Sequence, residues 1–215
     1  MKLYLIRHGT TEGNKRKAYI GARTDEPLCA KGMAQLQTKH YPKADIVFAS
    51  PMKRCIMTAE AIYPNQEMIL CEGFKEMDFG DFEGKSYEEL KDNPDYINWI
   101  ESGGEIAFPN GERKKDFVCR CQNAFRACIQ HVRQSSQEME TAAFVVHGGT
   151  IMAIMEEYGT PKGDYYGWRV QNGEFIELYI KLGKNEKNSD NTLKNRTIET
   201  DIICVRKTHN RPAPK

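Results

Sequence analysis

The residues that could do chemistry lie in three short polar motifs, and each motif follows an apolar run. The motifs are Arg7-His8-Gly9, Ser50-Pro51 leading to Arg54, and His147-Gly148-Gly149, and the runs before them cover residues 3–7, 44–49 and 142–146. Short apolar runs that break at glycine or proline are typical of buried strands. Because ligands bind at the carboxyl ends of parallel strands, we expect the three motifs to meet in one crevice.

Two histidines and two arginines in one crevice indicate a phosphate site. Guanidinium groups match phosphoryl oxygens bidentately, and glycines let backbone N–H groups approach them. Each residue also has a purely structural interpretation, because a histidine at a strand end can be a hydrogen-bonded core residue and an arginine can be a surface charge. The chain has no Walker loop, zincin motif, G-x-S-x-G elbow or paired-cysteine metal motif, so the common rival chemistries lack their residues.

The elements around these motifs alternate between strand and helix. Each apolar run is followed by a turn, and after the second and third runs apolar residues recur at helical spacing. Pro51 suits the first turn of the helix that we expect after the second run. Residues 112–133 carry apolar side chains at intervals of three and four, which predicts a core-facing helix. Residues 174–180 and 200–206 are later candidate strands. The pattern predicts a three-layer α/β/α sandwich with a mainly parallel central sheet.

Two segments differ from this pattern within what we interpret as a single domain, residues 1–215. Residues 72–116 hold 13 acidic and 6 basic residues, which favours an inserted acidic cap with a short helix at 87–91. Residues 181–215 hold 9 basic and 4 acidic residues, with a loop at 183–196 and a disordered tail at 209–215. Four aromatic residues could line a substrate pocket or only pack the cap: Tyr87, Tyr96, Trp99 and Trp168.

Composition restricts the partners. The chain has 215 residues and a formal net charge of +1, so it lacks the basic field that drives binding to nucleic acid or anionic membranes. Nowhere is an apolar stretch long enough to cross a bilayer. Seven scattered cysteines favour reduced thiols and a cytoplasmic location. Cys119 and Cys121 face different directions on a helix, so we expect no metal there.

The order of the motifs resembles that of the histidine phosphatase superfamily, the phosphoglycerate-mutase-like proteins. The residues that carry the resemblance are Leu5-Ile6-Arg7-His8-Gly9-Thr10-Thr11-Glu12-Gly13-Asn14, the loop from Gly21 to Gly32, Ser50-Pro51 with Arg54, the Glu76 to Gly84 stretch, and His147-Gly148-Gly149. These segments in the right order are far more specific than one arginine-histidine-glycine triplet. Within the family, the first loop and the 79–84 stretch look most like α-ribazole phosphatases.

The resemblance implies a role for each matching residue. The expected catalytic residues are His8 as nucleophile, Glu76 as general acid and base, and Arg7, Arg54 and His147 as phosphoryl-binding groups. The expected substrate-binding residues are Thr11, Asn14, Gly21 and Gly148. Glu72, Asp78 and Glu83 are rivals of Glu76, because they lie in the same acidic segment. The resemblance implies no metal and no cofactor, since the cations are side chains.

The expected function is metal-independent hydrolysis of a small phosphomonoester through a phosphohistidine, with α-ribazole 5′-phosphate as the leading substrate. Three alternatives stay open: a broad-specificity phosphatase, a phosphoglycerate mutase, and a non-catalytic phosphate-binding module. Mutases of this family carry further basic residues after the acid/base glutamate, whereas this chain has Met77-Asp78, which favours a phosphatase. The sequence leaves a homodimer open.

Overall fold

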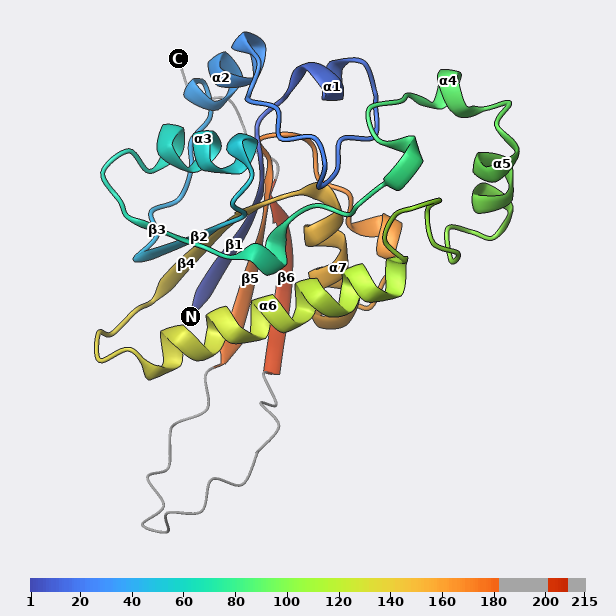
Figure 1. Ribbon diagram of the computed structural model, residues 1–215. Helices are drawn as coiled ribbons and strands as arrows, with labels where there is room; N and C mark the ends of the chain where they lie inside the picture. Colours follow the sequence, from blue (N-terminus) through green and yellow to red (C-terminus); the bar gives the residue numbers. More distant parts are fainter. Residues whose placement is uncertain (182–200, 209–215) are drawn as a thin grey trace.

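The fold is a twisted six-stranded sheet covered by helices on both faces (Figure 1). It is seen in a computed structural model, which describes residues 1–181 and 201–208. The strands are β1 (Lys2–Arg7), β2 (Ile46–Ala49), β3 (Met68–Leu70), β4 (Thr141–Val146), β5 (Phe175–Lys181) and β6 (Asp201–Thr208), in the order β3-β2-β4-β1-β5-β6. The four strands β1 to β4 are mutually parallel. Strand β5 is antiparallel to both of its neighbours, β1 and β6. The predicted α/β class with a mainly parallel sheet is confirmed.

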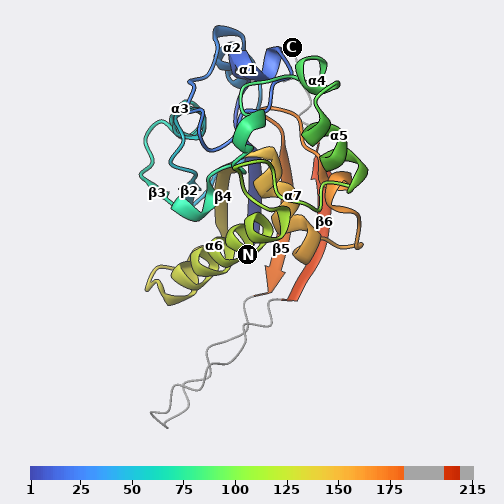
Figure 2. The same cartoon turned by 45° about the vertical axis from the view of Figure 1, so that its right-hand side comes forward.

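The two helical layers follow from the alternation of side chains along the strands. On one face, Leu5 and Phe144 pack with Phe125 of α6 (Lys114–Gln134) and Ile151 of α7 (Gly148–Tyr158). On the other face, neighbouring strand residues pack with Cys55 and other residues of α3 (Lys53–Ile62), and α2 (Ala30–Gln37) lies against α3. Figure 2 shows α6 and α7 on the opposite side of the sheet from α2 and α3. Both strand faces are buried, as in other doubly covered parallel sheets.

Residues 72–116 form short helices beside the carboxyl ends of the parallel strands (Figures 1 and 2). They are the 3₁₀ turns η1 (Glu72–Phe74) and η2 (Gly80–Phe82) and the helices α4 (Tyr87–Leu90) and α5 (Pro94–Glu101). An aromatic cluster around Phe82, Tyr96 and Phe108 packs these turns onto Phe117 of α6. A 3₁₀ turn, η3 (Tyr165–Trp168), follows α7, and the short helix α1 (Glu12–Lys15) follows β1.

Several predicted boundaries need correction. Pro51 lies outside the helix that follows the second apolar run, because this helix, α3, begins at Lys53 with Met52 as its N-cap. The predicted 112–133 helix begins at Lys114, because the backbone of its N-cap, Arg113, is extended (φ −82°, ψ 140°). Helices α2 and α5 and the three-residue strand β3 were not predicted. The predicted loop at 183–196 and tail at 209–215 lie outside the described residues.

Candidate active site

His8 lies directly after β1 and is fixed as a neutral imidazole. The backbone of His8 continues the ladder with β4, because its N–H donates to Val146 O at 2.9 Å. Its side chain is 3% exposed, and Nδ1 lies 2.7 Å from Gly9 O. A carbonyl oxygen can only accept, so Nδ1 carries the proton and Nε2 keeps its lone pair. Burial, with Arg54 and Arg7 nearby, holds the pKa of His8 well below 6.5.

His147 follows β4 and lies beside His8, with 5.2 Å between the ring centroids. The β1–β4 register brings the two rings together, because Arg7 pairs with Val146 and each histidine directly follows the last residue of its strand. The Nε–H of Arg54 donates to His147 Nδ1 at 3.2 Å, so the other ring nitrogen carries the proton and donates to Ser50 Oγ at 2.8 Å. Burial and Arg54 lower the pKa of His147.

Arg54 is fully buried on the first turn of α3 and positions the first loop as well as His147. Its Nη1 donates to Thr24 O at 2.8 Å and its Nη2 to Gly21 O at 3.0 Å. The fork geometry of a guanidinium allows these contacts together with the Nε bond to His147. Arg54 therefore joins three motifs that are far apart in the sequence.

Arg7 reaches the cavity from the end of β1. Its Nη1 donates to Val170 O at 2.8 Å, and its Nε is buried without a hydrogen-bond partner in the described part of the chain. Burial lowers the pKa of Arg7, and the nearby Glu76 opposes that effect. An unpartnered buried N–H on a cation is costly unless a ligand satisfies it. Arg7 is thus ready to bind an anionic oxygen.

Glu76 is the acidic residue that lies within the site. One of its oxygens accepts from Met77 N at 3.0 Å and the other from Gly149 N at 3.2 Å, at the start of α7. Burial raises its pKa, although both N–H groups and Arg54 act in the opposite direction. The carboxyl group is therefore one that can hold a proton at a higher pH than a free glutamate.

The three rivals of Glu76 are committed elsewhere. Glu72 forms an exposed ion pair with Lys75 at 2.8 Å, and Asp78 pairs with Arg23 at 2.7 Å. Glu83 accepts from the backbone N–H groups of Gly21 and Thr24. None of the three lines the cavity that contains Glu76.

The expected substrate-binding residues separate into two groups. Gly148 lines the cavity together with Arg7 and Glu76. Thr11 and Asn14 instead cap α1 reciprocally, and Asn14 Oδ1 also accepts from Asn172. Gly21 has both backbone groups occupied, by Arg54 and Glu83, and neither it nor the capping pair is among the residues that line the cavity.

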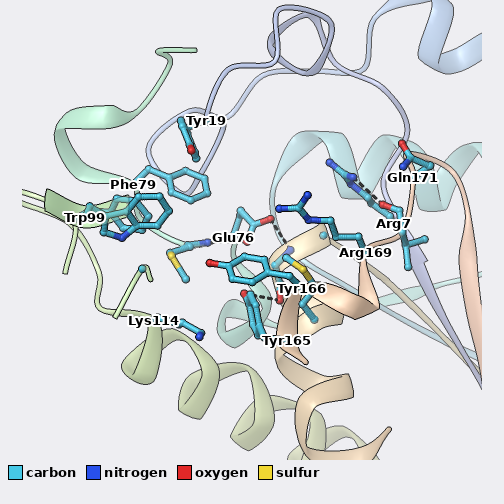
Figure 3. Close-up of a pocket in the computed structure, with 17 residues that line it drawn as sticks. Arg7, Tyr19, Glu76, Phe79, Trp99, Lys114, Tyr165, Tyr166, Arg169 and Gln171 are labelled. Atoms are coloured by element: carbon cyan, nitrogen blue, oxygen red, sulfur yellow. Dashed lines mark hydrogen bonds between the residues drawn. The ribbon is translucent and has the colours of Figure 1, made fainter. Parts of the chain in front are cut away.

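The cavity has a volume of about 450 Å³ and opens beside Arg7 and Glu76 (Figure 3). Sequence reasoning missed most of its wall, which includes Tyr19, Phe79, Phe108, Lys114, Tyr165, Tyr166, Arg169 and Gln171. Of the four aromatic residues left open, Trp99 lines the cavity, whereas Tyr87, Tyr96 and Trp168 do not. A lone Arg169 in a short turn carries no motif, so only the folded arrangement reveals it.

The structure of residues 1–181 and 201–208 also bears on metal sites and membrane spans. No group of three or more His, Cys, Asp or Glu side chains in these ranges could hold a metal ion. Cys119 is exposed and Cys121 is buried, so the two thiols point apart as their helical spacing predicts. No helix in the same ranges has the length and apolarity needed to span a membrane.

The arrangement suits phosphoryl transfer. It combines a neutral histidine with a free Nε2 lone pair, the Arg7 cation, and a buried carboxyl group with a raised pKa. Arg54 and His147 lie beside them and are hydrogen-bonded to each other. Phosphoryl transfer requires mainly positioning and charge stabilisation, with a nucleophile on one side and a proton donor for the leaving oxygen.

Comparisons with known proteins agree with this chemistry. The family model described as "Histidine phosphatase superfamily (branch 1)" matches residues 3–192. The adenosylcobalamin/alpha-ribazole phosphatase of Salmonella typhimurium is 27% identical over 193 residues, 85% of this chain and 92% of that protein. The broad-specificity phosphatase YOR283W of Saccharomyces cerevisiae is 30% identical over 170 residues, 73% of this chain and 69% of that protein.

Among solved structures, the alpha-ribazole phosphatase from Shigella flexneri aligns with a TM-score of 0.72 at 26% identity, covering 84% of this chain and 91% of that one. The family model spans the strands, helices and motifs that build the site. This protein therefore belongs to the histidine phosphatase superfamily, branch 1.

Proposed function

We propose that the protein is a metal-independent phosphomonoester hydrolase that works through a phosphohistidine at His8. The observation that supports this most is the fixed tautomer of His8, because its Nδ1–H bond to Gly9 O leaves Nε2 as the nucleophile. A lowered pKa keeps that nitrogen unprotonated near neutral pH. Membership of a superfamily that contains phosphatases supports the same reaction.

In the first step, Nε2 of His8 attacks phosphorus and the P–O bond to the leaving group breaks. Glu76 donates its proton to the departing oxygen, which a raised pKa makes possible. Arg7, Arg54 and His147 stabilise the charge on the transferring phosphoryl oxygens. The products of this step are the free alcohol and a phosphohistidine.

In the second step, water attacks phosphorus and the P–N bond breaks. The Glu76 carboxylate accepts the proton of the water, so the same group serves as acid and then as base. Inorganic phosphate leaves, and both His8 and protonated Glu76 return to their starting states.

For the substrate, we propose α-ribazole 5′-phosphate, with residues 72–116 acting as a cap over the leaving group. The names of the Salmonella and Shigella relatives support this substrate. The yeast relative's name supports a broad-specificity phosphatase as the second candidate. The cap role rests on the position of Met77, Phe79, Trp99 and Phe108 on the cavity wall.

The test is phosphate release in the presence of EDTA from α-ribazole 5′-phosphate, 3-phosphoglycerate and a simple alkyl phosphate. We expect wild-type protein to release phosphate, and His8→Ala to lose about a thousandfold or more in kcat while keeping its thermal unfolding transition. His40→Ala, a change of an exposed histidine, is the matched control. Retained turnover in His8→Ala, or loss of turnover in EDTA alone, would contradict the proposal. Isomerisation of 3-phosphoglycerate without phosphate release would establish a mutase instead.

A further inference from the structure

The cavity beside the phosphoryl site has aromatic rings on two sides. We call one side the Trp99 wall, and it consists of Tyr19, Phe79, Trp99 and Phe108. Tyr166 of η3 lies across the cavity from this wall, next to Tyr165 and near Arg169 (Figure 3). The ester oxygen of a bound substrate must lie near Glu76, so the leaving group extends between these two sides.

The rings of the Trp99 wall pack on each other and not on Tyr166. Trp99 stacks on Phe108 with 4.7 Å between centroids, and Phe79 meets Phe108 edge to face at 5.2 Å. Within the described residues, the ring contact of Tyr166 is with Tyr165, and its side chain remains 43% exposed. The Trp99 wall and Tyr166 both line one cavity of about 450 Å³.

The size of the cavity suits a ring-bearing ligand. An apolar cavity of roughly 150 Å³ accommodates a benzene ring, and pockets for drug-sized molecules begin at about 300 Å³. A three-carbon phosphate ester would leave most of the cavity of this protein empty. A planar ring would gain both area burial and ring-to-ring contact from the two aromatic sides.

Two cations lie near the ring of Tyr166. Lys114 is ion-paired with Glu105 at 2.9 Å and lies 5.7 Å from the centre of the Tyr166 ring. The guanidinium of Arg169 lies over the same ring at 5.4 Å. Lys114 is also 5.0 Å from the centre of the Tyr165 ring. Cation–π attraction from the two cations helps to hold Tyr166 in position.

We propose that the cavity selects phosphate monoesters whose leaving group carries a planar ring, held between the Trp99 wall and Tyr166. Trp99 and Tyr166 are then specificity-determining residues. This inference rests on the proposed function for the phosphoryl step and adds the side chains that select the leaving group. It also gives a reason for the partial exposure of Tyr166, which contributes little to the core.

The experiment compares benzyl phosphate with cyclohexylmethyl phosphate, because both release a primary alcohol and carry a six-membered ring, and only one ring is planar and aromatic. We expect kcat/KM to favour the benzyl ester by about tenfold. Tyr166→Leu should reduce that ratio by threefold or more, mainly through KM, whereas Tyr166→Phe should keep it. Tyr87→Leu changes an exposed aromatic residue of the same cap that lies outside the cavity, so it should leave the ratio unchanged.

A ratio near one in wild-type protein would overturn the inference, and so would a preference for aliphatic esters that carry a second phosphate. Binding of benzylphosphonate and cyclohexylmethylphosphonate, measured by calorimetry, separates this outcome from failure of the proposed function. Preferential binding of the benzyl compound without any turnover of phosphate esters would keep the ring selectivity and refute the hydrolase. Equal binding of the two phosphonates, together with His8-dependent turnover, would refute the ring selectivity and keep the hydrolase.

Discussion

Arg54 shows why residue type matters more than charge in this site. Its guanidinium has three hydrogen-bonding partners, two loop carbonyl groups and His147, while it remains fully buried. A lysine ammonium keeps the charge, but its single nitrogen cannot reproduce the planar fork. The side chain therefore orients the loop and the histidine in addition to providing positive charge.

We expect Arg54→Lys to lower kcat/KM for phosphate release by about a hundredfold or more, because His147 and the Gly21 carbonyl lose their donors. The matched control is Arg23→Lys, since Arg23 forms a surface ion pair with Asp78 outside the cavity. Steady-state kinetics on one alkyl phosphate measures both variants. Equal activities of wild-type protein and Arg54→Lys would remove Arg54 from the site.

At the residue scale, the sequence predicted what motifs encode and missed what the tertiary structure assembles. His8, Arg54 and Glu76 could be identified because each lies in a spaced motif, and the structure brings them together. Arg169 and Tyr166 could not be identified, because each approaches the cavity through the η3 turn rather than through any local pattern.

At the scale of elements, the ends of β1 and β4 and the start of α7 set the spacing of the site. The parallel register places His8 beside His147, and the first turn of α7 presents Gly149 N to Glu76. This approach is close: a Cβ atom on Gly149 would lie 2.3 Å from Glu76 Oε1. A Cβ atom on Gly148 would lie 3.3 Å from the Arg7 side chain, a milder contact.

Gly149→Ala should therefore displace the Glu76 carboxyl group and lower kcat on an alkyl phosphate by about tenfold to a hundredfold. The loss should be smaller on p-nitrophenyl phosphate, whose leaving group needs little protonation. Gly148→Ala is the control, and it should change the ratio of the kcat values for the two substrates less than Gly149→Ala does. Equal losses on both substrates in Gly149→Ala would argue against Glu76 as the proton donor.

The elements that could be predicted were those with strong periodicity. Strands β1 and β4 and the long helix α6 bury regular apolar positions, and their predicted ends were within two residues of the observed ones. Strand β3 has three residues, too few for a period, and two of them are exposed. Helix α5 lies in a segment rich in acidic, glycine and proline residues, which local patterns favour as loops.

At the scale of the whole molecule, the site exists because segments far apart in the sequence meet at one edge of the sheet. In the proposed mechanism, the strand ends supply the phosphoryl side, and the 72–116 segment and the η3 turn supply the leaving-group side. The sheet has a crossover topology, with β1 beside β4. The sequence predicted the α/β class of the fold but not this strand order. The size and aromatic character of the cavity depend on contacts between these distant segments.

Detection of a phosphoryl group on the protein during turnover tests the proposed phosphohistidine most sharply. Radiolabelled substrate is mixed with protein, quenched within milliseconds in alkali, and the labelled peptide is mapped. We predict an acid-labile, alkali-stable phosphoryl group on the peptide containing His8, absent from His8→Ala. Phosphate release by wild-type protein without any such adduct, or the same label in His8→Ala, would rule out a phosphohistidine at His8.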